Sequence, residues 1–496
     1  MQPSPLWQSN FTRLKSFSLP IYYATCNSRT LIYTPGIVCV MNKEYGPHIL
    51  EQLNNLTQKP NLKHDLSSID SYTLRDIAAK IIQAAQNAVN QLEEISVNDF
   101  APECLTLYMN NKCNMRCRYC YSGPGEFNSE TLSEPAVREA ARLVAGKCAE
   151  RKIPFTMVFH GGGEPTLNCS MADSFLGIAR EESGLFGIQL QTYIATNGAV
   201  SEETAKWLAN SFNLVGVSFD GPPEIQNRNR PGCNGQQMST YVERTMAILK
   251  HQGCPFHVRV TITNDTVVRQ KEIVTYIADH HAPDEIRIEP VYVNPSDESV
   301  MEAANADSFV SSFLEAKAEG ARYGVHVSTS ISRLNSVYGP YCNVLRRVLN
   351  LVPGDIATGC FLTSYSKDII TRNVNTGSFD TNQGTFRMDM ENIRSLIIRC
   401  SKRPTECEDC LCSFQCTFGC PDRCVLDSSG NNPLYENSPG NFRCAVNRRL
   451  MEKMICEAVD DAWNITQEGQ SQDIWDEKRK ITVSVYRYNY KDEVLP

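Results

Sequence analysis

The middle of the chain alternates between short apolar runs and longer segments with helical periodicity. The apolar runs fall at 105–109, 155–159, 188–195, 214–218, 256–263 and 286–290. The helical patterns between and after them cover 134–147, 171–182, 201–209, 240–251, 266–280 and 307–323. Because strands that alternate with helices form parallel sheets, residues 101–330 are predicted to be an α/β core, either open or curved into a partial barrel. Ligands of such folds bind at the carboxyl ends of the strands.

The flanking regions have different patterns. Residues 1–100 begin with three β-like runs, at 19–24, 30–33 and 37–41, and continue with helical periodicity, which predicts a small α+β domain. Residues 331–455 lose the alternation and are rich in Cys, Gly, Asn and Arg, so something other than a large apolar core must hold them together. Residues 456–496 carry a helical stretch and then a charged, alternating segment.

Composition excludes several classes of protein. The 496 residues are 42% hydrophobic and 21% charged, with a net charge of −8. This is ordinary globular composition, and no apolar run approaches the ~18–20 residues that span a bilayer. The start of the chain lacks a signal-peptide pattern. An isoelectric point near 5.6 argues against a protein held to nucleic acid by charge. We therefore expect neither a membrane nor a nucleic acid as partner.

The 21 cysteines are distributed unevenly. Three lie at Cys113, Cys117 and Cys120, and eight more lie between 400 and 444. A cysteine-rich secreted scaffold is usually short, whereas clustered cysteines in a long chain of cytosolic type more often bind metal. We therefore expect two metal-binding regions in a cytoplasmic protein.

The first cluster reads C-x₃-C-x₂-C and directly follows the first predicted core strand. Three thiolates on one loop can bind three irons of a cubane and leave the fourth iron open. A closed structural zinc site would need a fourth ligand, and no other Cys or His is close in sequence. A zinc knuckle remains the alternative for this triplet taken alone.

Three later segments end the next predicted strands in order. They are His160-Gly161-Gly162-Gly163-Glu164-Pro165 after the second, Ala195-Thr196-Asn197-Gly198 after the third and Ser218-Phe219-Asp220-Gly221 after the fourth. Glycines let a backbone approach a ligand closely, and Glu164 can receive an ammonium group. Taken alone, each segment could equally be a turn that caps the following helix.

Together these motifs resemble the radical S-adenosylmethionine (SAM) superfamily, in which an aromatic residue, here Tyr119, precedes the third cysteine. The resemblance implies a partial (β/α)6 TIM barrel and a 4Fe–4S cluster on Cys113, Cys117 and Cys120. The open iron of that cluster would bind SAM, which is reductively cleaved to a 5′-deoxyadenosyl radical. The resemblance also implies or allows further contacts with SAM. Their candidates are Tyr119, Gly161, Gly162, Gly163, Glu164, Pro165, Thr196, Asn197, Ser218 and Arg259.

Two further residues match family positions near the substrate. Asp220 resembles a position beside the substrate, and we take it as the candidate catalytic residue. Arg230 resembles a recurrent arginine of peptide-modifying members. The plain alternatives are a turn-capping aspartate and a solvated arginine.

The second cluster reads C-x₂-C-x₅-C-x₃-C, at Cys407, Cys410, Cys416 and Cys420, with Cys412 and Cys424 close by and Cys444 further on. By spacing alone it could hold iron–sulfur clusters or zinc. The run resembles the SPASM extension of radical SAM enzymes, which carries two auxiliary Fe–S clusters. The resemblance assigns Cys407, Cys410, Cys416 and either Cys444 or Cys424 to a distal cluster. It assigns Cys420, Cys342 and Cys360 to a proximal one.

The chain departs from the SPASM pattern at one place. The family usually has Gly-x₄-Cys after the second proximal ligand, and residues 375–384 here read NTGSFDTNQG without a cysteine. The proximal cluster is therefore expected to have an open iron, to recruit Cys424 or Cys412, or to be smaller.

SPASM-bearing members mostly modify peptides or proteins. The resemblance therefore implies a maturase that forms an oxidative thioether or carbon–carbon crosslink on a ribosomal precursor peptide, with a flavodoxin- or ferredoxin-type electron donor. Residues 1–100 then fit a winged-helix-like leader-recognition element, or a mere structural cap. Formylglycine formation, epimerisation and decarboxylation are alternatives, although the Asp that sulfatase-maturing members carry beside a proximal cysteine is missing after Cys342 and Cys360. A zinc-organised binding module without enzyme activity is an alternative of another class.

Overall fold

The computed structural model describes the chain in sixteen segments. They are residues 11–14, 19–26, 29–43, 46–57, 72–97, 100–120, 122, 130–291, 305–331, 343–361, 374–400, 407, 409–416, 439–457, 469–476 and 481–488. The predicted ligands Cys342, Cys420 and Cys424 lie outside the described residues. In the described part of the chain, no helix has the length and apolarity needed to cross a membrane.

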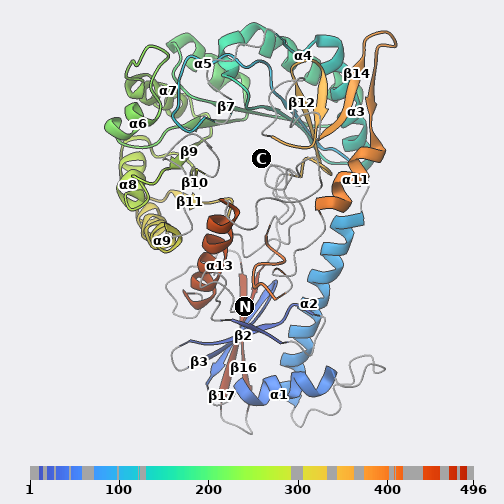
Figure 1. Ribbon diagram of the computed structural model, residues 1–496, viewed down its shortest axis with the longest axis vertical. Helices are drawn as coiled ribbons and strands as arrows, with labels where there is room; N and C mark the ends of the chain where they lie inside the picture. The colour runs from blue at the N-terminus through green and yellow to red at the C-terminus, as the bar shows by residue number, and fades with distance from the viewer. Residues whose placement is uncertain are drawn as a thin grey trace.

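A curved parallel sheet forms the upper half of the molecule (Figure 1). Its central strands follow one another in chain order: β5 (Cys104–Leu107), β6 (Phe155–Phe159), β7 (Leu190–Thr196), β8 (Leu214–Ser218), β9 (Phe256–Ile262) and β10 (Glu285–Pro290). The helices that cover its outer face are α3 (Glu134–Arg151), α4 (Cys169–Leu185), α5 (Glu202–Ser211), α6 (Pro223–Asn229), α7 (Ser239–His251), α8 (Gln270–His281) and α9 (Ala306–Arg322). The predicted partial (β/α)6 barrel is confirmed.

Contacts across the lumen show how strongly the sheet curves. The Tyr193 hydroxyl on β7 shares a hydrogen bond of 3.2 Å with His257 Nε2 on β9, although β8 lies between these two strands. The contact is possible because the intervening residue is Gly216, where a Cβ atom would lie 2.1 Å from the Tyr193 hydroxyl. Because Gly216 has no side chain on the inner face of β8, the side chains of the two neighbouring strands can meet above it.

Further strands extend the sheet at both edges. β11 (His326–Ser328) pairs in parallel with β10, and β12 (Val348–Val352) pairs in parallel with β5. Beyond β12, β13 (Ile356–Thr358), β14 (Asn375–Asp380) and β15 (Thr385–Met388) continue as an antiparallel meander. Next along the chain come α11 (Met390–Cys400) and α13 (Pro439–Glu457), whose residues Phe442 and Met451 are buried in the main core.

A second sheet forms the lower part of the molecule (Figure 1). Its strand order is β1 (Thr12–Arg13), β2 (Tyr22–Cys26), β3 (Arg29–Thr34), β4 (Ile37–Asn42), β17 (Ile481–Tyr488) and β16 (Gly469–Asp476). All its pairs are antiparallel, and β17 lies directly against β4. The two ends of the chain therefore share one sheet. The division into domains at 100, 330 and 455 stays a prediction.

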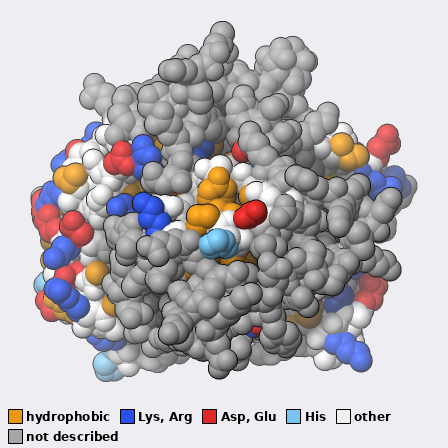
Figure 2. Space-filling model, turned by 90° about the horizontal axis from the view of Figure 1, so that it is seen from below, with side chains coloured by type: hydrophobic (Ala, Val, Ile, Leu, Met, Phe, Trp, Pro, Cys, Tyr) orange, Lys and Arg blue, Asp and Glu red, His pale blue; other side chains and the backbone are white. Residues whose placement is uncertain are grey.

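Two helices pack on this second sheet. α1 (Gly46–Thr57) and α2 (Tyr72–Val97) bury Ile49, Leu53, Ile77 and Ile81 against it in a separate apolar cluster. Figure 2 views this end of the molecule from below. Among the described side chains on that face, lysine and arginine gather to one side of a small central group of hydrophobic, acidic and histidine side chains.

Candidate functional site

The first cysteine loop follows β5 and is held in place by the segment that follows α6. The amide of Arg116 donates to the Pro231 carbonyl at 2.8 Å, and the amide of Arg118 donates to the Asn229 carbonyl at 3.0 Å. The amide of Cys120 turns back to the Cys117 carbonyl at 3.2 Å. The loop that carries the three cysteines is therefore fixed through its backbone at the carboxyl ends of the strands.

The three thiols influence one another. Burial raises the pKa of Cys113 to about 11 and that of Cys117 to about 12, and the neighbouring Cys120 adds to both shifts. No three His, Cys, Asp or Glu side chains among the described residues converge on a point where one metal ion would sit. A cluster that gives each thiolate its own iron does not need such convergence. Metal binding would deprotonate these buried thiols and supply the positive charge that they lack.

The glycine-rich segment lies against the start of the cysteine loop. Gly161 and Gly162 have φ values of +53° and +71°, in the left-handed region. A Cβ atom would lie 2.2 Å from the Tyr108 ring at Gly161 and 2.7 Å from the Asn110 carbonyl oxygen at Gly162. At Gly163 it would lie 2.1 Å from the Lys112 carbonyl oxygen. These glycines are therefore required by the chain's own residues 108–112, whatever else they bind.

Glu164 ties this segment to the end of β7. It is 2% exposed, and its Oε1 accepts hydrogen bonds from the Thr196 hydroxyl at 2.7 Å and from Thr166. Its Oε2 accepts from the Asn197 amide at 2.7 Å. Burial raises the pKa of Glu164, and these donors oppose that shift. Two of the segments that the sequence analysis singled out separately, 160–165 and 195–198, thus meet at this one carboxylate.

Asn197 continues the connection to the cysteines. Its Nδ2 donates to Asn114 Oδ1 at 2.7 Å and lies 3.7 Å from the Cys113 sulfur. The described geometry therefore joins Glu164, Asn197 and Cys113 into one cradle beside the cysteine loop. The predicted binding of SAM by Glu164, Pro165, Thr196 and Asn197 fits this cradle and stays a prediction.

Asp220 follows β8 and is completely buried. Its Oδ1 accepts from Arg230 Nε at 3.1 Å and from the Thr261 amide at 3.0 Å. Its Oδ2 accepts from the Tyr119 hydroxyl and from Asn229 Nδ2 at 3.4 Å. The structure thus places two predicted site residues, Tyr119 and Asp220, in direct contact.

The lumen of the barrel holds Arg259 and Ser218 side by side, because they are register partners on β9 and β8. The Arg259 guanidinium donates to His160 Nε2 across the sheet at 3.1 Å. Burial and this cation lower the pKa of His160 to about 3, so the imidazole is neutral. Arg259 therefore faces the side of the barrel where the glycine-rich segment begins, as a SAM contact would.

Cys360 lies beside the barrel rather than apart from it. The Tyr108 hydroxyl donates to the carbonyl of the next residue, Phe361, at 2.5 Å, and the Phe361 ring packs 5.9 Å from that of His160. The carbonyl of Cys360 itself accepts from Asn350 and Thr358. Cys360, a predicted ligand of the proximal cluster, thus directly precedes a residue that contacts Tyr108. Tyr108 lies between β5 and the first cysteine loop.

The second cysteine segment docks on the N-terminal sheet. The Tyr22 hydroxyl donates to the Cys410 carbonyl at 2.8 Å, and Gln415 Nε2 donates to the Tyr33 hydroxyl at 2.7 Å. A hydrogen bond from Cys412 lowers the pKa of Cys410 to about 6, and the Arg448 guanidinium acts in the same direction. Burial raises the pKa of Cys412, so Cys410 becomes a thiolate ligand more readily than Cys412 does.

Helix α13 brings Cys444 to the same place. Arg448, which acts on Cys410, lies four residues after Cys444 and so on the same face of the helix. Cys407, Cys410 and Cys416 belong to the segment that docks on the N-terminal sheet, and α13, which carries Cys444, reaches that segment through Arg448. Thiols are the donors that an iron–sulfur cluster takes.

The segment without its expected cysteine is the β14–β15 hairpin. Asp380 Oδ1 accepts from the amides of Asn382 at 3.0 Å and Gln383 at 3.2 Å, which closes the turn. Residues 381–384 at its tip are exposed. This hairpin is complete in itself, and its exposed tip carries only Thr, Asn, Gln and Gly side chains.

Sequence reasoning missed several residues that build the site. They are Tyr108, Asn114, Gly216, Asn229 and Thr261. Tyr108 and Asn114 flank the first motif and could have been suspected from their position. Gly216 and Thr261 carry no local signal, because their roles depend on which strands become neighbours.

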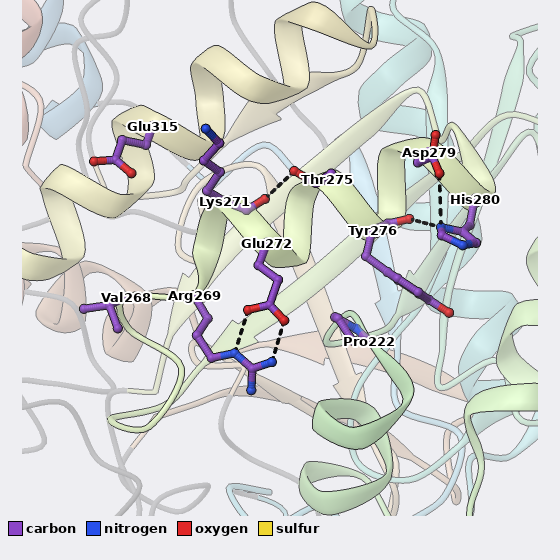
Figure 3. Close-up of a pocket in the computed structure, with 10 residues that line it drawn as sticks. All are labelled: Pro222, Val268, Arg269, Lys271, Glu272, Thr275, Tyr276, Asp279, His280 and Glu315. Atoms are coloured by element: carbon purple, nitrogen blue, oxygen red, sulfur yellow. Dashed lines mark hydrogen bonds and ion pairs between the residues drawn. The ribbon is translucent and has the colours of Figure 1, made fainter.

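A surface hollow of about 710 Å³ lies on the outer side of α8 (Figure 3). Its polar side chains largely bind one another, as in the pairs Arg269–Glu272 and His280–Asp279. It faces away from the lumen, because α8 covers the outer face of the sheet. The chemistry of the site therefore does not extend to this hollow.

Comparisons with known proteins agree with this geometry. Residues 107–277 match the Radical SAM superfamily. The chain is 28% identical over 168 residues to the cysteine-type anaerobic sulfatase-maturating enzyme of Clostridium perfringens, which is 33% of this chain and 45% of that enzyme. It is 23% identical over 157 residues to the serine-type anaerobic sulfatase-maturating enzyme of Klebsiella aerogenes, 31% of this chain and 38% of that enzyme. The matches thus span about half of these relatives or less.

The fold agrees as well. The structure of native anSMEcpe with bound AdoMet superposes with a TM-score of 0.55 at 18% identity, over 73% of this chain and 99% of that one. The fold and the superfamily match define residues 107–277 as a radical SAM domain. The superfamily match covers this part of the chain, and the residues before 107 and after 277 lie outside it.

Proposed function

We propose that the chain is a radical SAM/SPASM maturase that installs an oxidative intramolecular crosslink, a thioether or a carbon–carbon bond, on a ribosomally synthesised precursor peptide. The observation that carries this proposal is the second cysteine segment. The segment docks on the N-terminal sheet through Tyr22 and Tyr33, and Arg448 of α13, the helix that carries Cys444, favours the thiolate form of Cys410. A radical SAM enzyme that only cleaved SAM would need no such second set of ligands.

In this proposal Cys113, Cys117 and Cys120 hold the radical-generating 4Fe–4S cluster. Bound and reduced, the cluster and SAM supply a 5′-deoxyadenosyl radical that removes one hydrogen atom from the peptide. Around it, the Asn197 amide donates to the Glu164 carboxylate, and Arg259 is held towards the glycine-rich segment by His160. These residues orient the cofactor and exclude water, as cofactor enzymes require.

The second half of the oxidation needs an electron acceptor, which auxiliary clusters would supply. The peptide radical bonds to a thiol, ring or other side chain with loss of one proton and one electron. We assign that electron to auxiliary clusters on Cys407, Cys410, Cys416 and Cys444 and on Cys360 with Cys342 and Cys420. A flavodoxin- or ferredoxin-type protein in the cytoplasm supplies the reducing electron.

The N-terminal sheet is the proposed site for the precursor peptide. An extended peptide can add a strand at the edge of a sheet through backbone hydrogen bonds. Tyr22 and Tyr33 connect that sheet directly to the second cysteine segment. A peptide held there would lie next to the distal cluster ligands.

Formylglycine formation is the second candidate. The similarity to cysteine-type and serine-type sulfatase-maturating enzymes favours it. The residue after Cys342 argues against formylglycine formation. This residue is Asn343, and its Oδ1 accepts a hydrogen bond from Arg346 at 2.9 Å. An amide in this engaged position cannot act as the base that an aspartate would supply.

Mass spectrometry of a candidate precursor peptide tests the proposal, after anaerobic incubation with the reconstituted enzyme, SAM and dithionite. We expect loss of two hydrogens and an interrupted fragment series between the joined residues. A product that reacts with a hydrazide probe contains an aldehyde and would establish formylglycine formation instead. An unchanged mass with an inverted centre would establish epimerisation.

A further inference from the structure

Both oxygens of the Asp220 carboxylate are occupied by hydrogen-bond donors. Four donors reach its two oxygens, and they come from the first cysteine loop, from α6 and the residue after it, and from β9. Its own amide nitrogen also donates to Gln226 Oε1 at 2.8 Å. A carboxylate with both oxygens occupied has little capacity left to accept a proton from a substrate.

The ion pair with Arg230 makes this burial possible. Arg230 is 7% exposed, and its NH2 also donates to the Thr261 hydroxyl at 3.1 Å. A buried charge that loses its partner is strongly destabilising. Asp220 and Arg230 are thus mutually dependent.

Tyr119 connects this pair to the cysteine loop. It lies between Cys117 and Cys120 in sequence, its hydroxyl donates to Asp220, and the Arg230 guanidinium lies 5.1 Å from the centre of its ring. A cation over an aromatic ring is attracted to it. The aromatic residue of the motif is therefore held from one side by a carboxylate and from another by a guanidinium.

Both charges lie close to the cysteine loop. Tyr119, which both of them contact, directly precedes Cys120 and follows Cys117 by two residues. Charges that lie near one another in a poorly solvated site interact strongly.

We propose that Asp220 is a positioning residue of the cysteine loop: it fixes Tyr119 and Arg230, and its charge helps to set the reduction potential of the cluster. This inference rests on the proposed function, because it requires that Cys113, Cys117 and Cys120 hold that cluster. A reduced cluster carries one more negative charge than an oxidised one. Removal of the Asp220 charge therefore stabilises the reduced form and moves the potential in the positive direction.

The test compares Asp220→Asn with Asp265→Asn in the reconstituted full chain without SAM. Asp265 is a matched control, because it also pairs with an arginine, Arg228, at 2.6 Å but is about two-fifths exposed. Iron content, the electron paramagnetic resonance (EPR) spectrum of the reduced cluster and its midpoint potential are measured. We expect a positive shift and an altered spectrum for Asp220→Asn, and wild-type values for Asp265→Asn.

Tyr119→Phe provides a second variant that keeps the ring and removes only the hydroxyl. We expect it to lose iron to a chelator at least threefold faster than wild type, with an unchanged circular dichroism spectrum. Wild-type potential in Asp220→Asn or wild-type iron release in Tyr119→Phe would each overturn the inference. A wild-type protein that assembles no cluster on the first three cysteines would overturn the proposed function itself, which keeps the two failures apart.

Discussion

The Tyr22 hydroxyl and the Cys410 carbonyl, 388 residues apart, are joined by a hydrogen bond of 2.8 Å. The same hydroxyl lies 3.1 Å from Ser413 Oγ, and burial raises the pKa of Tyr22 well above its ordinary value. A buried phenol with two polar partners thus connects the N-terminal sheet to the segment that carries the proposed distal ligands.

We therefore predict that Tyr22→Phe lowers the free energy of unfolding by about 1–2 kcal/mol, because it removes the hydrogen bonds of the buried hydroxyl with the Cys410 carbonyl and with Ser413. Thermal unfolding of the anaerobic protein measures the effect. Tyr23→Phe, on the same strand at a partly exposed position, serves as the control and should stay within about 0.5 kcal/mol of wild type. Equal stability of the two variants would show that the Tyr22 contact does not stabilise the fold.

The glycine-rich segment offers a matched pair of substitutions. Gly162 and Gly187 have similar φ values of +71° and +65°, but a Cβ atom meets the Asn110 carbonyl at 2.7 Å in the first and nothing within 4 Å in the second. Gly187→Ala should cost about 1–2 kcal/mol, from the left-handed backbone alone. Gly162→Ala should cost more and should also weaken SAM binding, measured by isothermal titration. If the two variants unfold alike, the close approach to residue 110 is unimportant.

The lumen predicts a pH dependence of stability. Burial, with Arg287, Arg259 and His160 around the ring, lowers the pKa of His257 to about 2, and Tyr193 binds its Nε2. In the unfolded chain His257 is protonated near pH 6.5, whereas in the folded chain it stays neutral at that pH. The free energy of unfolding therefore decreases as the pH falls below about 6.5.

Between pH 6.5 and 5 this histidine alone should lower the free energy of unfolding by about 1–2 kcal/mol. The profile of His257→Gln should be flatter by that amount, whereas that of His251→Gln, at an exposed position, should follow wild type. Parallel profiles for all three proteins would refute the assignment.

The distal cluster gives a choice between two cysteines. Cys444 lies on the same face of α13 as Arg448, which interacts with Cys410. We therefore predict that the Cys444→Ser variant loses the iron of one auxiliary cluster. Cys424→Ser should keep it. Iron analysis and Mössbauer spectra of the reconstituted variants distinguish them, and the reverse result would assign the ligand to Cys424.

Much of the barrel could be predicted because its signals are local. The apolar runs at 155–159 and 214–218 coincide with β6 and β8, and the other core strands agree to within two residues. The predicted helix from 266 begins instead at Gln270, because Thr263 and Thr266 form a hydrogen-bonded turn first. Parallel strands with helices between them constrain their own neighbours, so periodicity is sufficient there.

The remaining features depend on long-range pairing that no local pattern encodes. That β17 would join the N-terminal sheet could not be read from an alternating segment, because such a segment pairs equally well with any open edge. The role of Asp220 was interpreted from its position alone. Its four donors come from separate elements, and only the folded chain brings them together.

The central claim is that the first three cysteines hold a cluster that cleaves SAM, and formation of 5′-deoxyadenosine tests it most directly. The chain is reconstituted anaerobically with iron and sulfide, then incubated with SAM and dithionite, and the nucleoside is quantified by liquid chromatography. We predict that wild type and Cys254→Ala, a buried cysteine with a packing role, both form 5′-deoxyadenosine. The variant with Cys113, Cys117 and Cys120 replaced by Ala should form none. A wild-type protein that retains zinc, binds no iron and leaves SAM intact would contradict the account.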